Sequence, residues 1–205
     1  MGIKVNLGIF GGTFDPIHIG HIEVANHAAS ELELDTVIFV PAGCPQLKNN
    51  SPEATPLQRF DMVKLAIDNQ KMFQVSDIEI KRKGPTFTVE TLAKIKENLN
   101  FKASLWFIVG ADAFSEFNKW ENHEKILKLS KICVVTRPGT NEQSENLNEL
   151  ITENKIMFVD WNTPRISSSQ VKKIMKDKLE VTKLLHPKVY DYIVKNDLYG
   201  NIKDK

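Results

Sequence analysis

The sequence lacks several features that define whole classes of protein. Its 205 residues include two cysteines, Cys44 and Cys133, which are too few to build a disulfide framework. No apolar run approaches the roughly 20 residues that a membrane-spanning helix needs. The charges nearly cancel, with 27 Lys and Arg against 26 Asp and Glu, so the positive excess typical of proteins that bind nucleic acid or membrane surfaces is missing. These absences favour a cytoplasmic protein with no nucleic-acid or membrane partner.

Two common phosphate-binding patterns are missing as well. There is no G-x-x-x-x-G-K-[ST] segment, so the sequence does not support a P-loop nucleotide triphosphatase. The first glycines do not follow the spacing G-x-G-x-x-G, so a dinucleotide-binding dehydrogenase is not supported either. Any phosphate site in this chain must therefore use other residues.

The residues that are present predict an α/β protein. A hydrophobic share of 41% suffices for a sizeable core, and the length suits one domain. Short apolar runs rich in β-branched and aromatic residues predict strands at 3–10, 37–40, 73–76, 105–109, 132–136 and 156–159. The first run alternates apolar residues and lacks the basic stretch and cleavage site of a signal peptide, so we expect it to be a strand.

Helical patterns lie between the predicted strands. Their apolar positions are Ile22, Ala25, Ala29 and Leu32, then Phe60, Val63, Leu65 and Ile67, then Leu92 and Ile95, and finally Ile126, Leu127 and Leu129. Strands that alternate with helices predict a Rossmann-like, doubly wound parallel sheet with helices on both faces. Beyond residue 160 the pattern changes to helices at 168–178 and 187–198. We therefore expect one domain, with a Rossmann-like core over 1–160 and a small helical cap over 161–205.

Two stretches without periodicity interrupt this pattern. Residues 41–56 contain four prolines, and residues 139–148 are mostly polar. The first stretch is either a surface loop beside a pocket or a mobile connection, and the sequence does not decide between them. The second is expected to be exposed.

The segment Gly11–His21, GGTFDPIHIGH, stands where the first strand meets the first helix. In an open parallel sheet ligands bind at the carboxyl ends of strands, and a helix N-terminus favours anions. Gly11 and Gly12 have no side chains to obstruct an anion, and His18 and His21 share one face of the first helical turn. The alternatives are a plain strand-to-helix connection and a metal site, for which two histidines without further ligands are too few.

This segment resembles the (H/T)xGH signature of the nucleotidylyltransferase superfamily, and specifically its nicotinate mononucleotide adenylyltransferase branch. The resemblance implies that ATP and nicotinate mononucleotide react to give deamido-NAD and pyrophosphate. It implies that His18 and His21 are catalytic and contact ATP phosphates, and that Gly11, Gly12, Thr13, Phe14 and Gly20 form the ATP-binding turn. It also implies no metal ligands on the protein, with Mg²⁺ bound through the phosphates of ATP.

A second segment, Arg165-Ile166-Ser167-Ser168-Ser169, precedes the 168–178 helix. Serines at a helix start can cap its free N–H groups, and the same groups can instead hold phosphate oxygens. The segment resembles the superfamily's ISSTxxR element, which implies that Ile166, Ser167, Ser168 and Lys172 bind the β- and γ-phosphates of ATP. Lys172 stands where Arg is usual and lacks the planar fork that grips phosphate through two bonds.

The resemblance extends to the acceptor. It implies nicotinate contacts from Thr86, Phe87 and Trp120, nucleotide-sugar contacts from Gly110 and Asp112, and acceptor-phosphate contacts from Lys48 and Arg137. The residues alone leave alternatives open. Trp120 could be a core aromatic, Thr86 and Thr88 could cap a helix, and Asp112 could simply begin one.

Several functions remain as alternatives. The acceptor could be nicotinamide mononucleotide or, less compatibly with His18 and the chain length, phosphopantetheine. A non-catalytic nucleotide-binding regulator could also use the same fold. The sequence does not indicate an oligomeric state.

Overall fold

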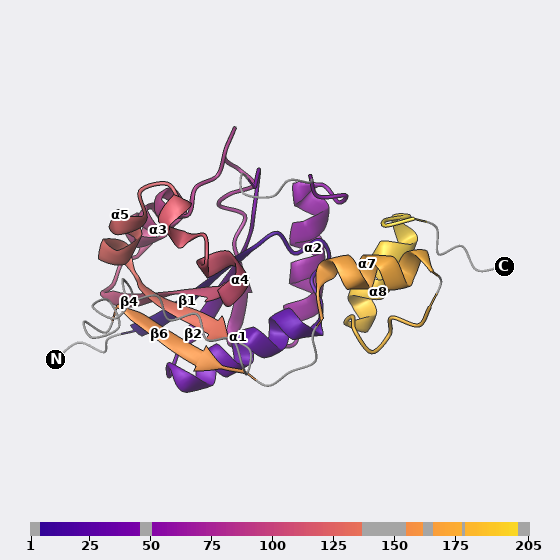
Figure 1. Ribbon diagram of the computed structural model, residues 1–205, viewed down its shortest axis with the longest axis horizontal. Coiled ribbons are helices and arrows are strands. Elements are labelled where there is room, and N and C mark those ends of the chain that lie inside the picture. Colours follow the sequence, from indigo (N-terminus) through magenta and orange to yellow (C-terminus); the bar gives the residue numbers. More distant parts are fainter. Residues whose placement is uncertain (1–4, 46–50, 137–154, 162–165, 178, 201–205) are drawn as a thin grey trace.

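The computed structural model describes residues 5–45, 51–136, 155–161, 166–177 and 179–200. Its centre is a parallel sheet of six strands in the order β3-β2-β1-β4-β5-β6 (Figure 1). The strands are β1 (Val5–Gly12), β2 (Thr36–Pro41), β3 (Phe73–Val75), β4 (Ala103–Gly110), β5 (Lys131–Thr136) and β6 (Ile156–Asp160). This order is that of doubly wound dinucleotide-binding folds, so the predicted Rossmann-like fold is confirmed.

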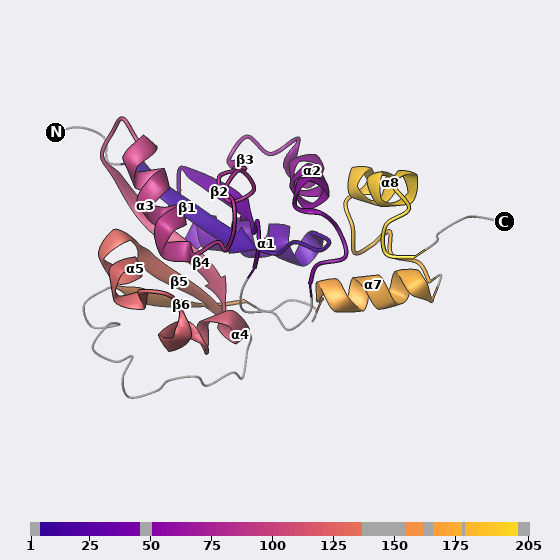
Figure 2. The ribbon, with the colours of Figure 1, turned by 90° about the horizontal axis from the view of Figure 1, so that it is seen from above.

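Helices cover both faces of the sheet (Figures 1 and 2). In chain order they are α1 (Ile19–Glu31), α2 (Pro56–Ile67), α3 (Thr88–Asn98), the short α4 (Ala111–Phe114), a 3-10 turn η1 (Phe117–Lys119), α5 (His123–Leu129), α7 (Ser168–Lys176) and α8 (Pro187–Lys195). One hydrophobic cluster joins α1, α2, α7 and α8 to one face, and a second joins α3, α4 and α5 to the other.

Strands β1, β2, β4 and β5 bury both faces over at least half of their length, as their nearly continuous apolar runs predict. Successive residues of β1 point in opposite directions, so Phe10 lies in the cluster with α1 and α2 and Ile9 in the cluster with α3. In β4, Ile108 and Phe107 divide in the same way. Cys133 of β5 is fully buried, and this burial raises the pKa of its thiol to about 12. It is therefore a small core residue, as expected.

Helix α2 differs in detail from the prediction. Its buried residues are Arg59, Met62, Val63, Ala66 and Ile67, whereas the predicted stripe had included Phe60 and Leu65, which are only partly buried. Arg59 lies at helical spacing from the apolar members of this stripe and extends it by one turn.

The N-cap of α3 is Phe87, which makes no side-chain capping bond, so Thr86 and Thr88 do not cap this helix.

Lys48, Arg137 and the polar stretch 139–148 lie outside the described residues. Within the described ranges, no helix combines the length and apolarity needed to cross a membrane.

The C-terminal helices pack beside α2 rather than over the sheet (Figure 2). Val171 and Met175 of α7 and Val189 and Ile193 of α8 are buried in the same hydrophobic cluster as α1 and α2. The predicted helical cap is therefore present, and α7 begins close to the first strand-to-helix turn. The description of the whole chain as one domain stays a prediction.

The strand order reverses between β1 and β4, which pair with Phe10 opposite Ile108. Each strand continues for two residues beyond this pair, so the two carboxyl ends lie side by side at Gly12 and Gly110. Open α/β sheets bind their ligands at such a switch point.

Candidate active site

The turn after β1 is built around the ring of Phe14. Phe14 is 2% exposed, has a positive φ of 51°, and packs edge-on against Phe10 and His21. A Cβ at Gly12 would lie 2.7 Å from this ring, so Gly12 is needed to make room for Phe14. The backbone of the turn, and not the Phe14 side chain, is thus what can face a ligand.

His18 is the N-cap residue of α1 and is 6% exposed. Burial lowers its pKa to about 4, so the ring is neutral near pH 7. Its Nδ1 is buried and has no hydrogen-bond partner among the described residues. Such an atom in a protein is a place where a ligand is expected to complete the hydrogen bonding.

His21 lies directly beside His18, with the two ring centroids 3.8 Å apart. The backbone N–H of His18 donates to Nδ1 of His21 over 3.2 Å. Because Nδ1 accepts, a neutral His21 has its proton on Nε2, which is then a donor. Gly20 permits this packing, since a Cβ there would lie 3.0 Å from Nδ1 of His18.

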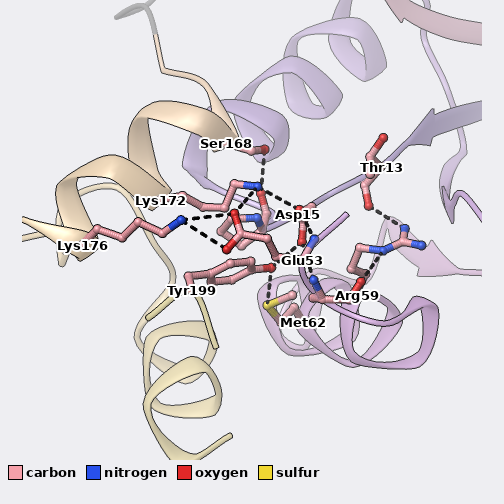
Figure 3. Close-up of polar contacts among 11 residues, drawn as sticks. Thr13, Asp15, Glu53, Arg59, Met62, Ser168, Lys172, Lys176 and Tyr199 are labelled. Atoms are coloured by element: carbon pink, nitrogen blue, oxygen red, sulfur yellow. Dashed lines mark hydrogen bonds and ion pairs between the residues drawn. The ribbon is translucent and has the colours of Figure 1, made fainter. Parts of the chain in front are cut away.

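Asp15, inside the same segment, is the centre of a buried polar network (Figure 3). Its carboxylate accepts from the backbone N–H groups of Glu53 and Ala54, from Lys172, and from the hydroxyl of Tyr199. Burial acts to raise the pKa of Asp15, but the two backbone amides, with Lys172 and Tyr199, outweigh burial and hold it below its usual value. Asp15 is therefore an ionised, fully engaged carboxylate that holds the turn in place.

Lys172 lies between two carboxylates, with Nζ 3.0 Å from Asp15 and 3.1 Å from Glu53 (Figure 3). Burial alone would lower its pKa, but these two carboxylates raise it above the ordinary value. Lys176 also pairs with Glu53, at 3.4 Å. The lysine predicted to bind phosphate thus lies beside Asp15 of the first segment, and its charge is engaged by acidic side chains.

The second predicted phosphate segment lies against the first. Ser168 donates its hydroxyl to the carbonyl of Pro16 over 2.9 Å, although 152 residues separate the two. Ile166 is the neighbour that a Cβ at Gly20 would approach, at 3.8 Å. Ser167 is the N-cap of α7, where its hydroxyl accepts from the N–H of Gln170. The two segments are therefore brought together, and the capping role considered for the serines holds for Ser167.

Arg59 supports this region and was missed in the sequence. It is 1% exposed and donates to the carbonyls of Thr13, Ala42, Gly43 and Ala54. One guanidinium thus ties the β1 turn to the segments before and after the loop that follows β2. The detectable signal was its helical spacing from the apolar Met62, Val63 and Ala66, which an assumption of exposed charge conceals.

The described residues predicted to bind the acceptor contact different elements. Trp120 packs edge-on against Phe107, and its buried Nε1 has no partner among the described residues. Thr86 donates its hydroxyl to the carbonyl of Cys44, which joins the α3 approach to the loop after β2. Phe87 is partly buried, whereas Gly110 and Asp112 are exposed, and a Cβ at Gly110 would meet nothing within 4 Å. The open space is at the carboxyl end of β4.

A hollow of about 810 Å³ lies elsewhere, between α3 and the segments 76–82 and 121–125. None of the predicted site residues lines it. Its charged side chains pair with one another, as in Lys81–Asp77 and Arg82–Glu90. The two buried side-chain atoms without a partner among the described residues, Nδ1 of His18 and Nε1 of Trp120, belong to residues that do not line this hollow.

Comparisons with known proteins identify relatives of this chain. A cytidylyltransferase-like family model matches residues 9–174. A Clostridium perfringens "Probable nicotinate-nucleotide adenylyltransferase" is 41% identical over 197 residues, which cover 94% of this chain and 97% of that protein. A relative of the same name from Caldicellulosiruptor saccharolyticus is 37% identical over 95% of this chain and 99% of its own length.

A solved structure shows the same fold. It is the Plasmodium falciparum nicotinic acid mononucleotide adenylyltransferase complexed with NaAD, which superposes with a TM-score of 0.76 over 96% of this chain and 98% of that one. Its sequence is 24% identical, so this likeness concerns the fold.

Proposed function

The chain belongs to the cytidylyltransferase-like family and, within it, to the nicotinate-nucleotide adenylyltransferases, and on that basis we propose that it transfers the adenylyl group of ATP to nicotinate mononucleotide in NAD biosynthesis. The products are nicotinate adenine dinucleotide and pyrophosphate. One structural observation supports this most. Two candidate phosphate segments, far apart in sequence, are joined by the Ser168–Pro16 and Lys172–Asp15 contacts at the switch point of the sheet.

On the ATP side, the backbone of Gly11, Gly12, Thr13 and Phe14 lines the turn, and His18, Gly20 and His21 follow at the start of α1. His18 offers the unpartnered Nδ1, and His21 offers a donor at Nε2. Ile166, Ser167 and Ser168 bring the N-terminus of α7 to the same place, where free N–H groups favour phosphate oxygens. Gly110 and Asp112 face the open end of β4 and are assigned to the nucleotide sugars.

The reaction needs no covalent enzyme intermediate. An oxygen of the acceptor phosphate attacks the α-phosphorus of ATP, a new P–O bond forms, and the bond to the β-phosphate oxygen breaks. Negative charge grows on the departing pyrophosphate, where His18, His21 and the α7 N-terminus supply hydrogen-bond donors. Catalysis then rests on alignment and on stabilising this charge.

The divalent cation, for which we propose Mg²⁺, enters with ATP. Among the described residues no group of three or more His, Cys, Asp or Glu side chains could hold a metal ion, so the cation is assigned to the triphosphate. Bound there, it neutralises part of the phosphate charge. Two cysteines in 205 residues favour the reducing cytoplasm as the place of the reaction.

On the acceptor side, Thr86, Phe87 and Trp120 are assigned to the nicotinate group. Trp120 is held by Phe107 and Phe117, so it is rigid enough to support a pyridine ring. Lys48 and Arg137, whose charges suit the acceptor phosphate, complete the assignment. Each of these roles is part of the proposal.

The deciding experiment measures pyrophosphate released from ATP when nicotinate mononucleotide is added to the purified chain. The same assay with nicotinamide mononucleotide as acceptor serves as the control. We expect kcat/KM for the acid to exceed that for the amide by about 10²-fold or more, because a site that pairs a carboxylate discriminates against a neutral isostere. If no pyrophosphate is released with either nicotinate mononucleotide or nicotinamide mononucleotide as acceptor, the result would indicate a non-catalytic nucleotide-binding regulator and would overturn the proposal.

A further inference from the structure

Tyr199 is buried although it lies in a turn outside the helices and strands. It follows α8, is 3% exposed, and adopts a positive φ of 63°. Its ring belongs to the cluster that contains α2, α7 and α8. A buried tyrosine needs a hydrogen-bond partner for its hydroxyl.

The hydroxyl of Tyr199 donates to Oδ1 of Asp15 over 2.8 Å (Figure 3). Asp15 belongs to the Gly11–His21 segment and is 5% exposed. A buried carboxylate must be surrounded by donors, so each donor fixes where the carboxylate sits. Tyr199 therefore acts on the turn that immediately precedes His18.

The ring of Tyr199 touches the other phosphate segment. Nζ of Lys172 lies 5.7 Å from the ring centroid, a distance at which a cation is attracted to an aromatic face. Lys172 also pairs with Asp15, so the three side chains form a closed set of contacts. One tyrosine thus contacts a residue from each of the two segments assigned to ATP phosphates.

We propose that Tyr199 is a positioning residue for ATP, because its hydroxyl fixes Asp15 of the first phosphate segment and its ring holds Lys172 of the second. It touches no substrate itself. It sets the spacing between the turn before α1 and the start of α7. This inference rests on the proposed function, since ATP must bind between these segments.

A purely structural role for Tyr199 makes a different prediction, and the chain contains a matched case. Tyr192 of α8 donates its hydroxyl to Asp61 of α2 over 3.0 Å, which is the same type of tyrosine–carboxylate bond from the C-terminal part of the chain to a different element. Asp61 belongs to neither phosphate segment. Tyr192→Phe therefore reports the loss of a structural tyrosine–carboxylate bond alone.

The experiment compares Tyr199→Phe and Tyr192→Phe with the wild type in the full chain. ATP binding is measured by titration calorimetry without acceptor, and the KM for each substrate is measured by pyrophosphate release. Tyr199→Phe is expected to raise the Kd and KM for ATP about tenfold, since small displacements of positioning groups have effects of this size or larger. The KM for nicotinate mononucleotide should stay within about twofold. Tyr192→Phe should lower Tm and leave both ATP constants unchanged.

Two results would overturn the inference. One is an ATP Kd for Tyr199→Phe within about twofold of the wild type, given the tenfold effect expected of a positioning group. The other is equal weakening of ATP binding in Tyr192→Phe, which would indicate general loosening. If the wild type binds ATP but releases no pyrophosphate with either acceptor, the proposed function fails, while ATP calorimetry still tests Tyr199.

Discussion

His18 and His21 share one helical face and yet differ in their surroundings. His21 has its Nδ1 occupied by a backbone N–H, which leaves Nε2 as the donor that a developing negative charge requires. We expect His21→Ala to lower kcat by roughly 10²–10³, as the loss of an oxyanion-hole donor does, with a much smaller change in the Kd for ATP. Single-turnover rates and ATP calorimetry provide the measurement.

The control for this variant is His27→Ala on the same helix. His27 contacts the carbonyl of Asp160 and lies outside both phosphate segments. The His27→Ala variant should retain full turnover. Near-normal turnover in His21→Ala would remove the role assigned to that residue.

His18 makes stability depend on pH. Its pKa is about 4 in the folded chain against 6.5 for the free side chain, so between these values only the unfolded chain binds the proton. Stability from the neutral ring is therefore complete at pH 7 and decreases as the pH falls. Between pH 7 and pH 5 the wild type should lose about 2 kcal/mol more unfolding free energy than His18→Asn.

Urea denaturation of both proteins at the two pH values measures this difference. Equal losses of unfolding free energy in the wild type and in His18→Asn would show that the His18 ring takes up a proton in the folded state. The comparison is direct because other titrating groups are common to both proteins.

At the residue scale, the sequence predicted the two candidate phosphate segments, but it did not predict the side-chain contacts that join them. The glycines, histidines and serines of the two segments are local patterns, and the structure brings them together. The partners of Lys172 were not predictable, because Asp15 lies 157 residues away and no local rule relates them. Arg59 was missed for a related reason, since its acceptors are backbone carbonyls that have no signature in the sequence.

At the scale of elements, the start of α7 has two roles that can be separated. Ser167 and Gln170 form a reciprocal cap, in which the Ser167 N–H donates to Oε1 of Gln170 and the Gln170 N–H donates to the serine hydroxyl. Ser167→Ala should cost about 1 kcal/mol of unfolding free energy, as lost caps do, and should also raise the KM for ATP. Urea denaturation and steady-state kinetics measure the two effects.

Gln170→Ala is the matched variant, because it removes the other half of the cap, the bond from the Ser167 N–H to Oε1 of Gln170, and keeps the hydroxyl assigned to phosphate. It should lose part of the stability with an unchanged KM for ATP. If both variants raise this KM equally, the serine acts on ATP only through the helix.

The elements that the sequence predicted well are those with long, regular patterns. All six strands lie within a few residues of their predicted ranges, and the runs of β1, β2, β4 and β5 are distinctive because they are buried on both faces. The short α4 and η1 were not predicted, since four and three residues are too few to show a helical period. Thr86 and Thr88, which the sequence left open as caps of α3, do not cap it, and Thr86 instead donates its hydroxyl to the carbonyl of Cys44.

At the scale of the whole molecule, the C-terminal helices share a hydrophobic cluster with α1 and α2. If the chain unfolds as one unit, a cavity in α8 must destabilise the sheet as well. Ile193 is fully buried, so Ile193→Ala should lower the unfolding free energy by about 3 kcal/mol.

Tryptophan fluorescence is the measurement, because Trp106, Trp120 and Trp161 all precede the C-terminal helices. As a control, Val194→Ala changes a residue on the same helix that is 38% exposed, and its effect should be small. An unchanged fluorescence transition in Ile193→Ala would show that the C-terminal part unfolds separately.

The bond between Tyr199 and Asp15 also has a consequence for the order of synthesis. The two residues are 184 positions apart, which at ordinary translation rates of about 5–20 residues per second separates their addition by roughly 10–40 s. During that interval the Gly11–His21 segment exists without the Tyr199 hydroxyl that holds the Asp15 carboxylate. A nascent chain therefore completes the site proposed for ATP only after α8 and Tyr199 have left the ribosome.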